Sequence, residues 1–237
     1  IAKTLSNYGA ELAITYQNDI LLKRIKPLAS SINCNFLIPC DVSDKTNIPN
    51  CFDLISKKWG KVDFVVHAIA HSDKKELSGR YINTSKENFL KTLDISCFSL
   101  TAIAKESKKL MDNGGSIISL SFYGSKKVMP NYNVMGVAKA ALEISIKYLS
   151  VDLGKKNIRI NGISASPMRT LSGAVIGNAR EIFNYTKKHS PLNRNTSLEE
   201  IGNSALYLLS DLSTGVTGEI MYVDCGYKIL GMPNPIN

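Results

Sequence analysis

Hydrophobic positions along the chain follow two alternating spacings. Short runs rich in β-branched residues are typical of buried strands, and longer stretches with hydrophobic residues at every third or fourth position are typical of helices packed on one face. The predicted strands are residues 12–16, 35–41, 62–70, 117–122, 158–165 and 219–223. The predicted helices are residues 1–8, 19–31, 45–58, 85–111, a helix from 131 onwards, and 197–210 with Ser197 and Glu200 at capping-box spacing.

Strands that alternate with helices in this way predict right-handed crossovers and a mostly parallel sheet. The expected fold class is therefore α/β, with a single doubly wound, Rossmann-like sheet, and the expected organisation is one domain over residues 1–237. Residues 164–170 are expected to form a loop, and residues 171–189 an irregular, partly helical insertion. No linker, low-complexity segment or internal repeat divides the sequence.

Ligands of doubly wound sheets bind beyond the carboxyl ends of the strands. In this chain those ends carry Gln17, the pair Asp41 and Val42, and residues 68–70, 119–123 and 164–170. The candidate binding groups therefore converge on one edge of the predicted sheet.

A tyrosine and a lysine occupy the helix that begins near residue 131. Tyr132 and Lys139 are seven residues apart, so both side chains leave the same face, about 10 Å apart along the axis. A nearby ammonium favours the phenolate and lowers the pKa of a tyrosine, which is ordinarily about 10. The lysine can also donate to sugar hydroxyls, which leaves the tyrosine to face a substrate oxygen. Because this spacing is common on solvated helix edges, the surrounding motifs decide its meaning.

The composition is that of an ordinary globular protein, with 44% hydrophobic and 21% charged residues. No hydrophobic run reaches about 18 residues and the first residues predict no secretory signal, so no membrane association is expected. The net charge of +9 comes from lysines scattered in pairs, which argues against nucleic acid as a partner. Five cysteines without a CxxC motif argue against a zinc site and suit a reducing, cytoplasmic location.

Six segments together resemble the short-chain dehydrogenase/reductase superfamily and, more narrowly, the bacterial enoyl-acyl-carrier-protein reductases of type II fatty acid synthesis. The resemblance runs from residue 1 to near residue 232. The segments that carry it are TYQND (15–19), CDV (40–42), PNYNVMGVAKAALE (130–143), RTL (169–171), GNSALYLLSDLS (202–213) and TGEIMYVDCGY (217–227).

The resemblance implies that NADH reduces the trans-2 double bond of an enoyl thioester. Tyr132 would stabilise and help to protonate the enolate oxygen, and Lys139 would hold the nicotinamide ribose. The segment 171–189 would close over the acyl chain. Ser72 would join Tyr132 at the substrate. The other residues that the resemblance assigns to the cofactor are Gln17, Asp41 and Val42 (the latter two at the adenine), Ile69, Met168, Arg169, Thr170, Leu171 and Ser172.

The strand at 12–16 ends without an arginine to hold a 2′-phosphate, which favours NADH over NADPH. Lys23 and Arg24 lie a turn or more into the next helix and leave NADPH open. The resemblance further implies an acyl carrier protein as partner, which the basic surface could steer, and a homotetramer.

Four features depart from the family pattern. The Gly-rich turn and the strand before it are absent, and that strand would lie between the strands that contain Ile14 and Val65. We therefore expect the working protein to have a further upstream segment. Phe122 occupies the position of the family's outer tyrosine, Ser166 replaces a glycine, and His71 replaces an apolar aromatic residue. Because phenylalanine cannot donate a proton, a slowed enzyme is one expectation.

Two other functions remain open at this point. One is a 3-oxoacyl or other carbonyl reductase that uses Ser119, Tyr132 and Lys139, although HAIA at 67–70 differs from the Asn-Asn-Ala-Gly turn usual in such enzymes. The other is a non-catalytic remnant that binds partners only.

Single residues also have plainer interpretations. Asp41 suits an Asx turn at the end of a strand. Ile69 and Met168 suit core packing, and His67 suits a buried histidine with both ring nitrogens satisfied.

Overall fold

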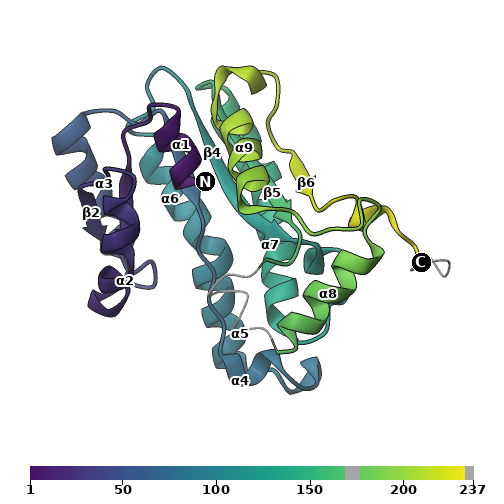
Figure 1. The fold of residues 1–237 in the computed structure, drawn as a ribbon. Coiled ribbons are helices and arrows are strands. Elements are labelled where there is room, and N and C mark those ends of the chain that lie inside the picture. The colour runs from purple at the N-terminus through teal and green to yellow at the C-terminus, as the bar shows by residue number, and fades with distance from the viewer. Residues whose placement is uncertain (169–176, 233–237) are drawn as a thin grey trace.

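The computed structural model describes residues 1–168 and 177–232, and the path of the chain is shown in Figure 1. The strands are β1 (Ala13–Tyr16), β2 (Phe36–Pro39), β3 (Phe64–His67), β4 (Gly115–Phe122), β5 (Ile158–Ala165) and β6 (Ile220–Val223). The α-helices are α1 (Ala2–Asn7), α2 (Asp19–Ser30), α3 (Asn47–Trp59), α4 (Lys74–Leu77), α5 (Lys86–Leu93), α6 (Ser99–Ser107), α7 (Asn133–Gly154), α8 (Ala179–His189) and α9 (Leu198–Leu209). The short helical turns used below are η2 (Asp94–Phe98), η3 (Tyr123–Ser125) and η5 (Asp211–Ser213).

Most predicted elements are confirmed, with ends that differ by a few residues. The capping box of α9 is present: the Ser197 hydroxyl accepts from the Glu200 N–H, and the Glu200 carboxylate accepts from the Ser197 N–H. The helical part expected within residues 171–189 is α8, and residues 171–176 lie outside the described residues. The last turn of α8 carries two lysines and a histidine, and basic residues stabilise a helix at that end.

The predicted helix 85–111 is neither regular nor as long as expected. Its middle is the π-helical turn η2, in which the backbone hydrogen bonds span one residue more than in an α-helix. The Ser99 hydroxyl donates to the Ile95 carbonyl at 2.6 Å inside this turn. The helix ends at Ser107, whose hydroxyl donates to the Ile103 carbonyl at 2.6 Å and competes with continuation of the helix.

The parallel α/β fold is confirmed, but the strands form two ladders rather than one continuous sheet. β1 pairs with β2, and β3, β4, β5 and β6 pair in that order, all in parallel. Among the described residues no ladder joins β1 to β3, so the expected doubly wound sheet is interrupted at this point. The break falls between the strands with Ile14 and Val65, where the sequence predicts a central strand that it does not itself contain. That strand stays a prediction.

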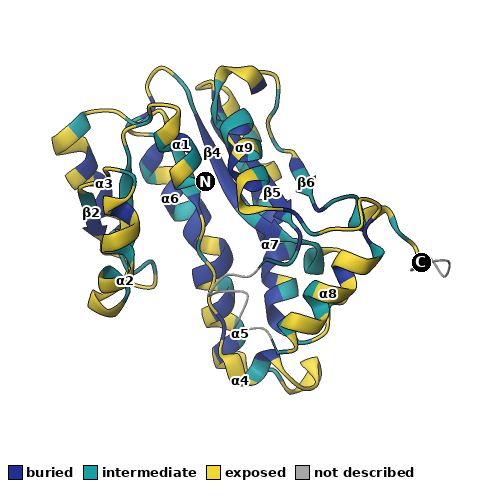
Figure 2. Cartoon of the chain, in the orientation of Figure 1, coloured by how far each residue is buried: buried dark blue, intermediate teal, exposed yellow. Residues whose placement is uncertain are grey.

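Helices cover both faces of the larger ladder (Figure 1). Successive strand residues point to opposite faces, so Ile117 packs with α6 and α7 while Ile118 packs with α9. In β5, Ile160 packs with α6 and α7, and Ile163 packs with α9. Figure 2 shows that the buried residues concentrate on these strands and on the sides of α6 and α7 that face them. The two faces give the site a rigid support.

The smaller ladder is joined to the larger one by a hydrophobic cluster. Ile38 of β2 and Phe52 of α3 pack with Ile103 of α6, and Val65 of β3 lies against the same cluster. The carboxyl ends of all six strands therefore belong to one packed body.

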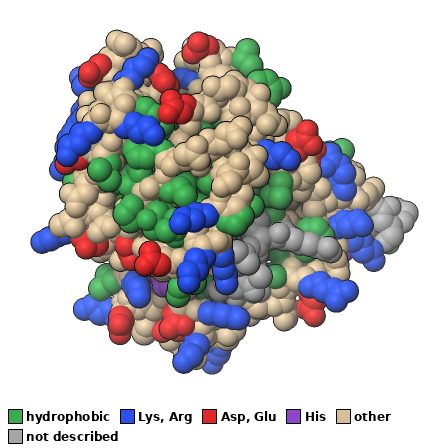
Figure 3. Space-filling view, turned by 60° about the vertical axis from the view of Figure 1, so that its left-hand side comes forward, with side chains coloured by type: hydrophobic (Ala, Val, Ile, Leu, Met, Phe, Trp, Pro, Cys, Tyr) green, Lys and Arg blue, Asp and Glu red, His purple; other side chains and the backbone are tan. Residues whose placement is uncertain are grey.

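Within the described ranges, no helix has the length and hydrophobicity needed to cross a membrane. On the face seen in Figure 3, basic side chains are dispersed among acidic ones and around a hydrophobic area rather than gathered into one block. This distribution agrees with the scattered lysine pairs of the sequence.

Candidate active site

The turn that carries Tyr132 is built by two asparagines. Asn131 and Asn133 have φ angles of 56° and 35°, a left-handed region that asparagine tolerates better than most residues. The Asn131 amide donates to the Gly177 carbonyl at 3.0 Å, and the Asn133 amide donates to the Glu76 carbonyl at 3.0 Å. Tyr132 lies between them as the residue before α7. Its backbone position is therefore held from both sides.

The Tyr132 ring is buried, with 7% of the residue exposed. It packs with Leu77 and Met135 and meets Phe122 edge to face, with ring centroids 5.0 Å apart. Its hydroxyl has no hydrogen-bond partner among the residues that the structure describes. Burial raises the pKa of Tyr132, and the negative charge of Glu143 raises it further. The expectation that Lys139 lowers this pKa is therefore wrong for the protein alone.

Lys139 is also buried, and its ammonium is directed at the backbone of β4. Its Nζ donates to the Leu120 carbonyl at 2.6 Å. Burial lowers the pKa of Lys139 to about 8, and the nearby Cys97 and Glu143 act in the opposite direction. Tyr132 contacts β4 through Phe122, so the end of this strand receives both side chains. The structure thus brings the tyrosine and the lysine to one strand end, as the sequence predicts.

Gln17 and Asp41 meet at the carboxyl ends of β1 and β2. The Gln17 amide donates to Asp41 Oδ2 at 3.0 Å, while Asp41 Oδ1 accepts from the Ser43 N–H at 3.0 Å and from its hydroxyl at 2.7 Å. The bond to the Ser43 N–H is the Asx turn considered above. Burial opposes ionisation of Asp41, but the hydrogen bonds from Ser43 and Gln17 outweigh it and lower the pKa. An ionised carboxylate therefore faces solvent at this edge.

Val42 and Ile69 lie near this edge and are partly buried against the cluster around Ile38. Met168 is partly buried against the cluster that α9 forms with the sheet. Their packing agrees with the plainer interpretation, and their roles toward a cofactor stay predictions. Four further predicted cofactor residues lie outside the described residues: Arg169, Thr170, Leu171 and Ser172.

The structure places Ser72 in a buried network rather than at a free surface. Its hydroxyl receives a hydrogen bond from Thr92 at 3.0 Å and lies 3.3 Å from both side-chain polar atoms of Asn88. Both partners belong to α5. The predicted contact between Ser72 and a substrate stays a prediction.

His67 is the satisfied core histidine that the sequence suggests. Its Nδ1 lies 2.8 Å from the Ser119 hydroxyl and its Nε2 lies 2.8 Å from the Ser99 hydroxyl. Burial and the charge of Lys139 lower the pKa of His67 to about 3, so its ring is neutral. Ser119, the serine that a carbonyl reductase would use, is itself fully buried and held by His67.

Two features of the site were missed by reasoning from the sequence. Glu143 is fully buried one turn after Lys139. The signal for it was a charged residue in the hydrophobic stripe of the helix. The role of the asparagines that flank Tyr132 was also missed, because no residue pattern in the sequence predicts their positive φ angles.

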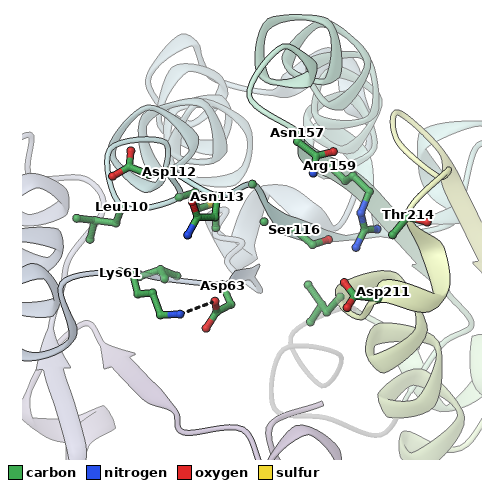
Figure 4. A pocket seen from close by; sticks show the side chains of 15 residues that line it. Lys61, Asp63, Leu110, Asp112, Asn113, Ser116, Asn157, Arg159, Asp211 and Thr214 are labelled. Atoms are coloured by element: carbon green, nitrogen blue, oxygen red, sulfur yellow. Dashed lines mark ion pairs between the residues drawn. The ribbon is translucent and has the colours of Figure 1, made fainter.

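A hollow at the other end of the sheet is not the candidate site. Figure 4 shows it, lined by residues at the amino ends of β3, β4 and β5. Tyr132 follows the opposite, carboxyl end of β4 and does not line it. Its two basic groups already have partners: Lys61 pairs with Asp63 at 3.7 Å, and Arg159 donates to the Leu208 and Ser210 carbonyls. Across the ranges that the structure describes, no cluster of three His, Cys, Asp or Glu side chains suits a metal ion.

Comparison with known proteins gives one family. The family profile described as Enoyl-(Acyl carrier protein) reductase matches residues 1–228. The chain is 57% identical to "Enoyl-(acyl-carrier-protein) reductase (NADH) 2" of Rhizobium meliloti, over 98% of this chain and 87% of that protein. It is 53% identical to the FabI enoyl-(acyl-carrier-protein) reductase (NADH) of Rickettsia bellii, over 98% and 88% of the two chains.

Solved structures agree with these relatives. The crystal structure of the enoyl-(acyl-carrier-protein) reductase of Anaplasma phagocytophilum in complex with NAD superimposes with a TM-score of 0.95 at 54% identity, covering 99% of this chain and 89% of that one. FabI of Candidatus Liberibacter asiaticus gives 0.96 at 55% identity, covering 99% and 91%.

Proposed function

We propose that this chain, which belongs to the enoyl-(acyl carrier protein) reductase family, uses NADH to reduce the trans-2 double bond of enoyl thioesters in type II fatty acid biosynthesis. The observation that carries the proposal is the arrangement of two buried groups, Tyr132 and Lys139, against the end of β4. Ser119 does not fit a carbonyl reductase, because its hydroxyl is enclosed in the core with His67.

The residues of the chain fit NADH at two places. Asp41 presents an oriented, ionised carboxylate beyond β2, and a carboxylate accepts hydrogen bonds from the amino group of an adenine. The same negative charge disfavours a neighbouring 2′-phosphate. The Lys139 ammonium, now bonded to the Leu120 carbonyl, can donate to the two ribose hydroxyls. We assign Val42, Ile69 and Met168, with residues 169–172, to the same cofactor.

When bound, NADH supplies the hydride for the β-carbon of the enoyl thioester. Tyr132 donates a hydrogen bond to the thioester oxygen, on which negative charge develops, and supplies a proton there. The high pKa of Tyr132 keeps its hydroxyl protonated at neutral pH. Phe122 forms the wall beside the Tyr132 ring and excludes water. Ser72 is assigned to the substrate side of this pocket.

The acyl carrier protein is the expected carrier of the substrate, and the net charge of +9 favours encounter with an acidic partner. Because such steering is screened by salt, KM for crotonyl-acyl carrier protein is expected to rise several-fold between 50 and 500 mM NaCl. KM for a small crotonyl thioester is the control and is expected to stay constant.

A homotetramer is part of this proposal. Four exposed hydrophobic residues form one stripe along α7, within an arc of about 60°: Val137, Ile144, Tyr148 and Val151. A second copy of the chain is the occupant that we assign to this stripe, since exposed apolar stripes of this kind mark interfaces. A cytoplasmic location is also proposed, because all five cysteines are free thiols.

Spectrophotometry of NADH oxidation tests the activity. Crotonyl thioester is expected to support turnover, and acetoacetyl thioester is not; turnover with acetoacetyl thioester only would overturn the proposal. Tyr132→Phe is expected to lower kcat by roughly 10²–10³-fold. The matched control is Tyr123→Phe, because the Tyr123 hydroxyl donates to the Lys228 carbonyl at 3.2 Å instead of facing the pocket.

Calorimetry with NADH separates the enzyme from a remnant that only binds partners. Binding of NADH together with turnover supports the reductase. A folded protein that binds no NADH would favour the remnant.

A further inference from the structure

Glu143 is a fully buried carboxylate that the proposed reaction does not use. It lies on α7 four residues after Lys139, on the side that faces β4. A buried charge is costly unless its surroundings compensate it, so such a group requires a specific explanation.

The partners of Glu143 all come from one short segment at the end of β4. Its Oε1 accepts from the Ser121 hydroxyl at 2.6 Å and from the Ser125 hydroxyl at 2.5 Å, and its Oε2 lies 3.0 Å from Lys126 Nζ. Oε1 is therefore hydrogen-bonded twice, whereas Oε2 has the ion pair with Lys126 but no hydrogen bond, and the carboxylate joins residues 121–126 to α7.

The same segment packs against the Tyr132 ring. Phe122 meets the Tyr132 ring edge to face, and Gly124 lies so close that a Cβ atom there would be 2.5 Å from Tyr132 Cδ1. A shift of this segment relative to α7 would therefore change the position of the ring. The carboxylate of Glu143 connects the two by two hydrogen bonds and an ion pair.

The segment is also connected to Lys139. The Lys139 ammonium donates to the Leu120 carbonyl, and the next residue along β4, Ser121, donates to Glu143. Two successive turns of α7 thus hold two successive residues of β4. The negative charge of Glu143 also opposes the effect of burial on Lys139, whose pKa is about 8.

We propose that Glu143 is a positioning residue, whose buried carboxylate holds the end of β4 and the ammonium of Lys139 in register with Tyr132. This inference rests on the reductase function proposed above. Glu143 acts through Tyr132 and Lys139 and does not itself touch the substrate.

The titratable groups around Glu143 determine how pH enters the test. Lys126 faces it from the segment after β4, Tyr222 from β6, Lys139 from its own helix, and Tyr132 from the residue before that helix. Removal of the Glu143 charge lowers the pKa of both Lys139 and Tyr132, because both are raised by it. Removal of the positive charge of Lys126 leaves the negative charge of Glu143 less compensated, and this raises the pKa of both Lys139 and Tyr132.

The experiment compares Glu143→Gln and Lys126→Met with the wild type. Glu143→Gln is expected to lower kcat/KM by roughly 10–100-fold and to move the alkaline limb of its pH profile to lower pH. Lys126→Met is expected to move that limb to higher pH. Glu199→Gln, an exposed glutamate in the first turn of α9, is the matched control and is expected to follow the wild type.

A second readout uses the protein without cofactor. In protein labelled with ¹³C at the lysine ε-carbon, the Lys139 resonance is expected to titrate at lower pH in Glu143→Gln than in the wild type. Unchanged titration and an unchanged pH profile in both variants would overturn the inference, even if their activity fell. If circular dichroism shows that Glu143→Gln does not fold, Lys126→Met alone tests the inference. A shift of the alkaline limb of its pH profile to higher pH supports the inference, and a shift to lower pH overturns it. A wild type without turnover would instead overturn the proposed function.

Discussion

Replacing Gly124 by alanine is expected to displace the Tyr132 ring without removing any functional group. A Cβ atom at position 124 would lie 2.5 Å from Tyr132 Cδ1 and 2.8 Å from Tyr132 Cε1. The backbone at Gly124 has little freedom to withdraw, because it lies against Gly136 of α7, where a Cβ atom would itself approach the Gly124 carbonyl to 2.8 Å. The tyrosine ring must therefore move.

The size of the effect follows from these distances. Ordinary van der Waals contact requires a shift of the ring by about 1 Å, and overpacking of this kind costs about 1–3 kcal/mol of stability. A misplacement of about 1 Å in a catalytic group costs about 100-fold in rate. This corresponds to about 2.7 kcal/mol of transition-state stabilisation. The expected decrease in kcat/KM is therefore larger than the decrease in the fraction of folded protein that the lower stability would cause.

The assay measures NADH oxidation with crotonyl thioester, together with urea unfolding of the same preparation. Gly154→Ala, at the end of the same helix, is the matched control, because a Cβ atom there meets nothing within 4 Å. A folded Gly124→Ala variant with the kcat/KM of the wild type would refute the reasoning, since it would show that the position of the Tyr132 ring does not limit the reaction.

Four further outcomes are expected. Arg159→Met should lower the free energy of unfolding by about 1.5–3 kcal/mol in urea titrations, because the guanidinium binds the carbonyls at the end of α9, and should leave the activity of the folded protein unchanged. Ser197→Ala should lower it by about 1 kcal/mol through loss of the capping box; an unchanged urea midpoint would contradict this. The His67 ring should stay neutral down to pH 5 in ¹⁵N NMR, because its pKa is about 3. An unfolded histidine binds a proton near pH 6.5. The contribution of neutral His67 to the free energy of unfolding should therefore be fully present above pH 6.5 and be lost as pH decreases toward 3. Tyr148→Glu on the exposed stripe of α7 should dissociate the proposed oligomer in light scattering, and a persisting oligomer would place the interface elsewhere.

Much of the site could be predicted because it depends on local spacing and on chain direction. The separation of seven residues directs Tyr132, just before α7, and Lys139, on α7, to the same end of β4. Gln17 and Asp41 meet because the carboxyl ends of parallel strands lie at one edge of a sheet, and the structure joins them at 3.0 Å. Neither conclusion requires knowledge of distant contacts.

The remainder depends on partners that are distant in the sequence. The direction of the Tyr132 pKa shift is set by enclosure among Leu77, Met135 and Phe122, which no spacing reveals. Ser72 is engaged by α5, and the π-helical turn has no pattern that distinguishes it from a regular helix. The interrupted ladder between β1 and β3 likewise appears only once the strands are placed in space.

The widened turn η2 keeps α5 and α6 in rotational phase. A π-helical turn takes about one residue more than an α-helical turn, so η2 absorbs one additional residue without rotating the helix that follows. On one side of the turn Thr92 reaches Ser72, and on the other Ser99 reaches His67. Deleting a single residue from this turn is expected to give a regular α-helix with both hydroxyls still directed at their partners, whereas a deletion between Thr92 and Ser99 in a regular helix would rotate one of them away by about 100°. This turn is therefore the place in the helix where the number of residues can change without loss of either contact.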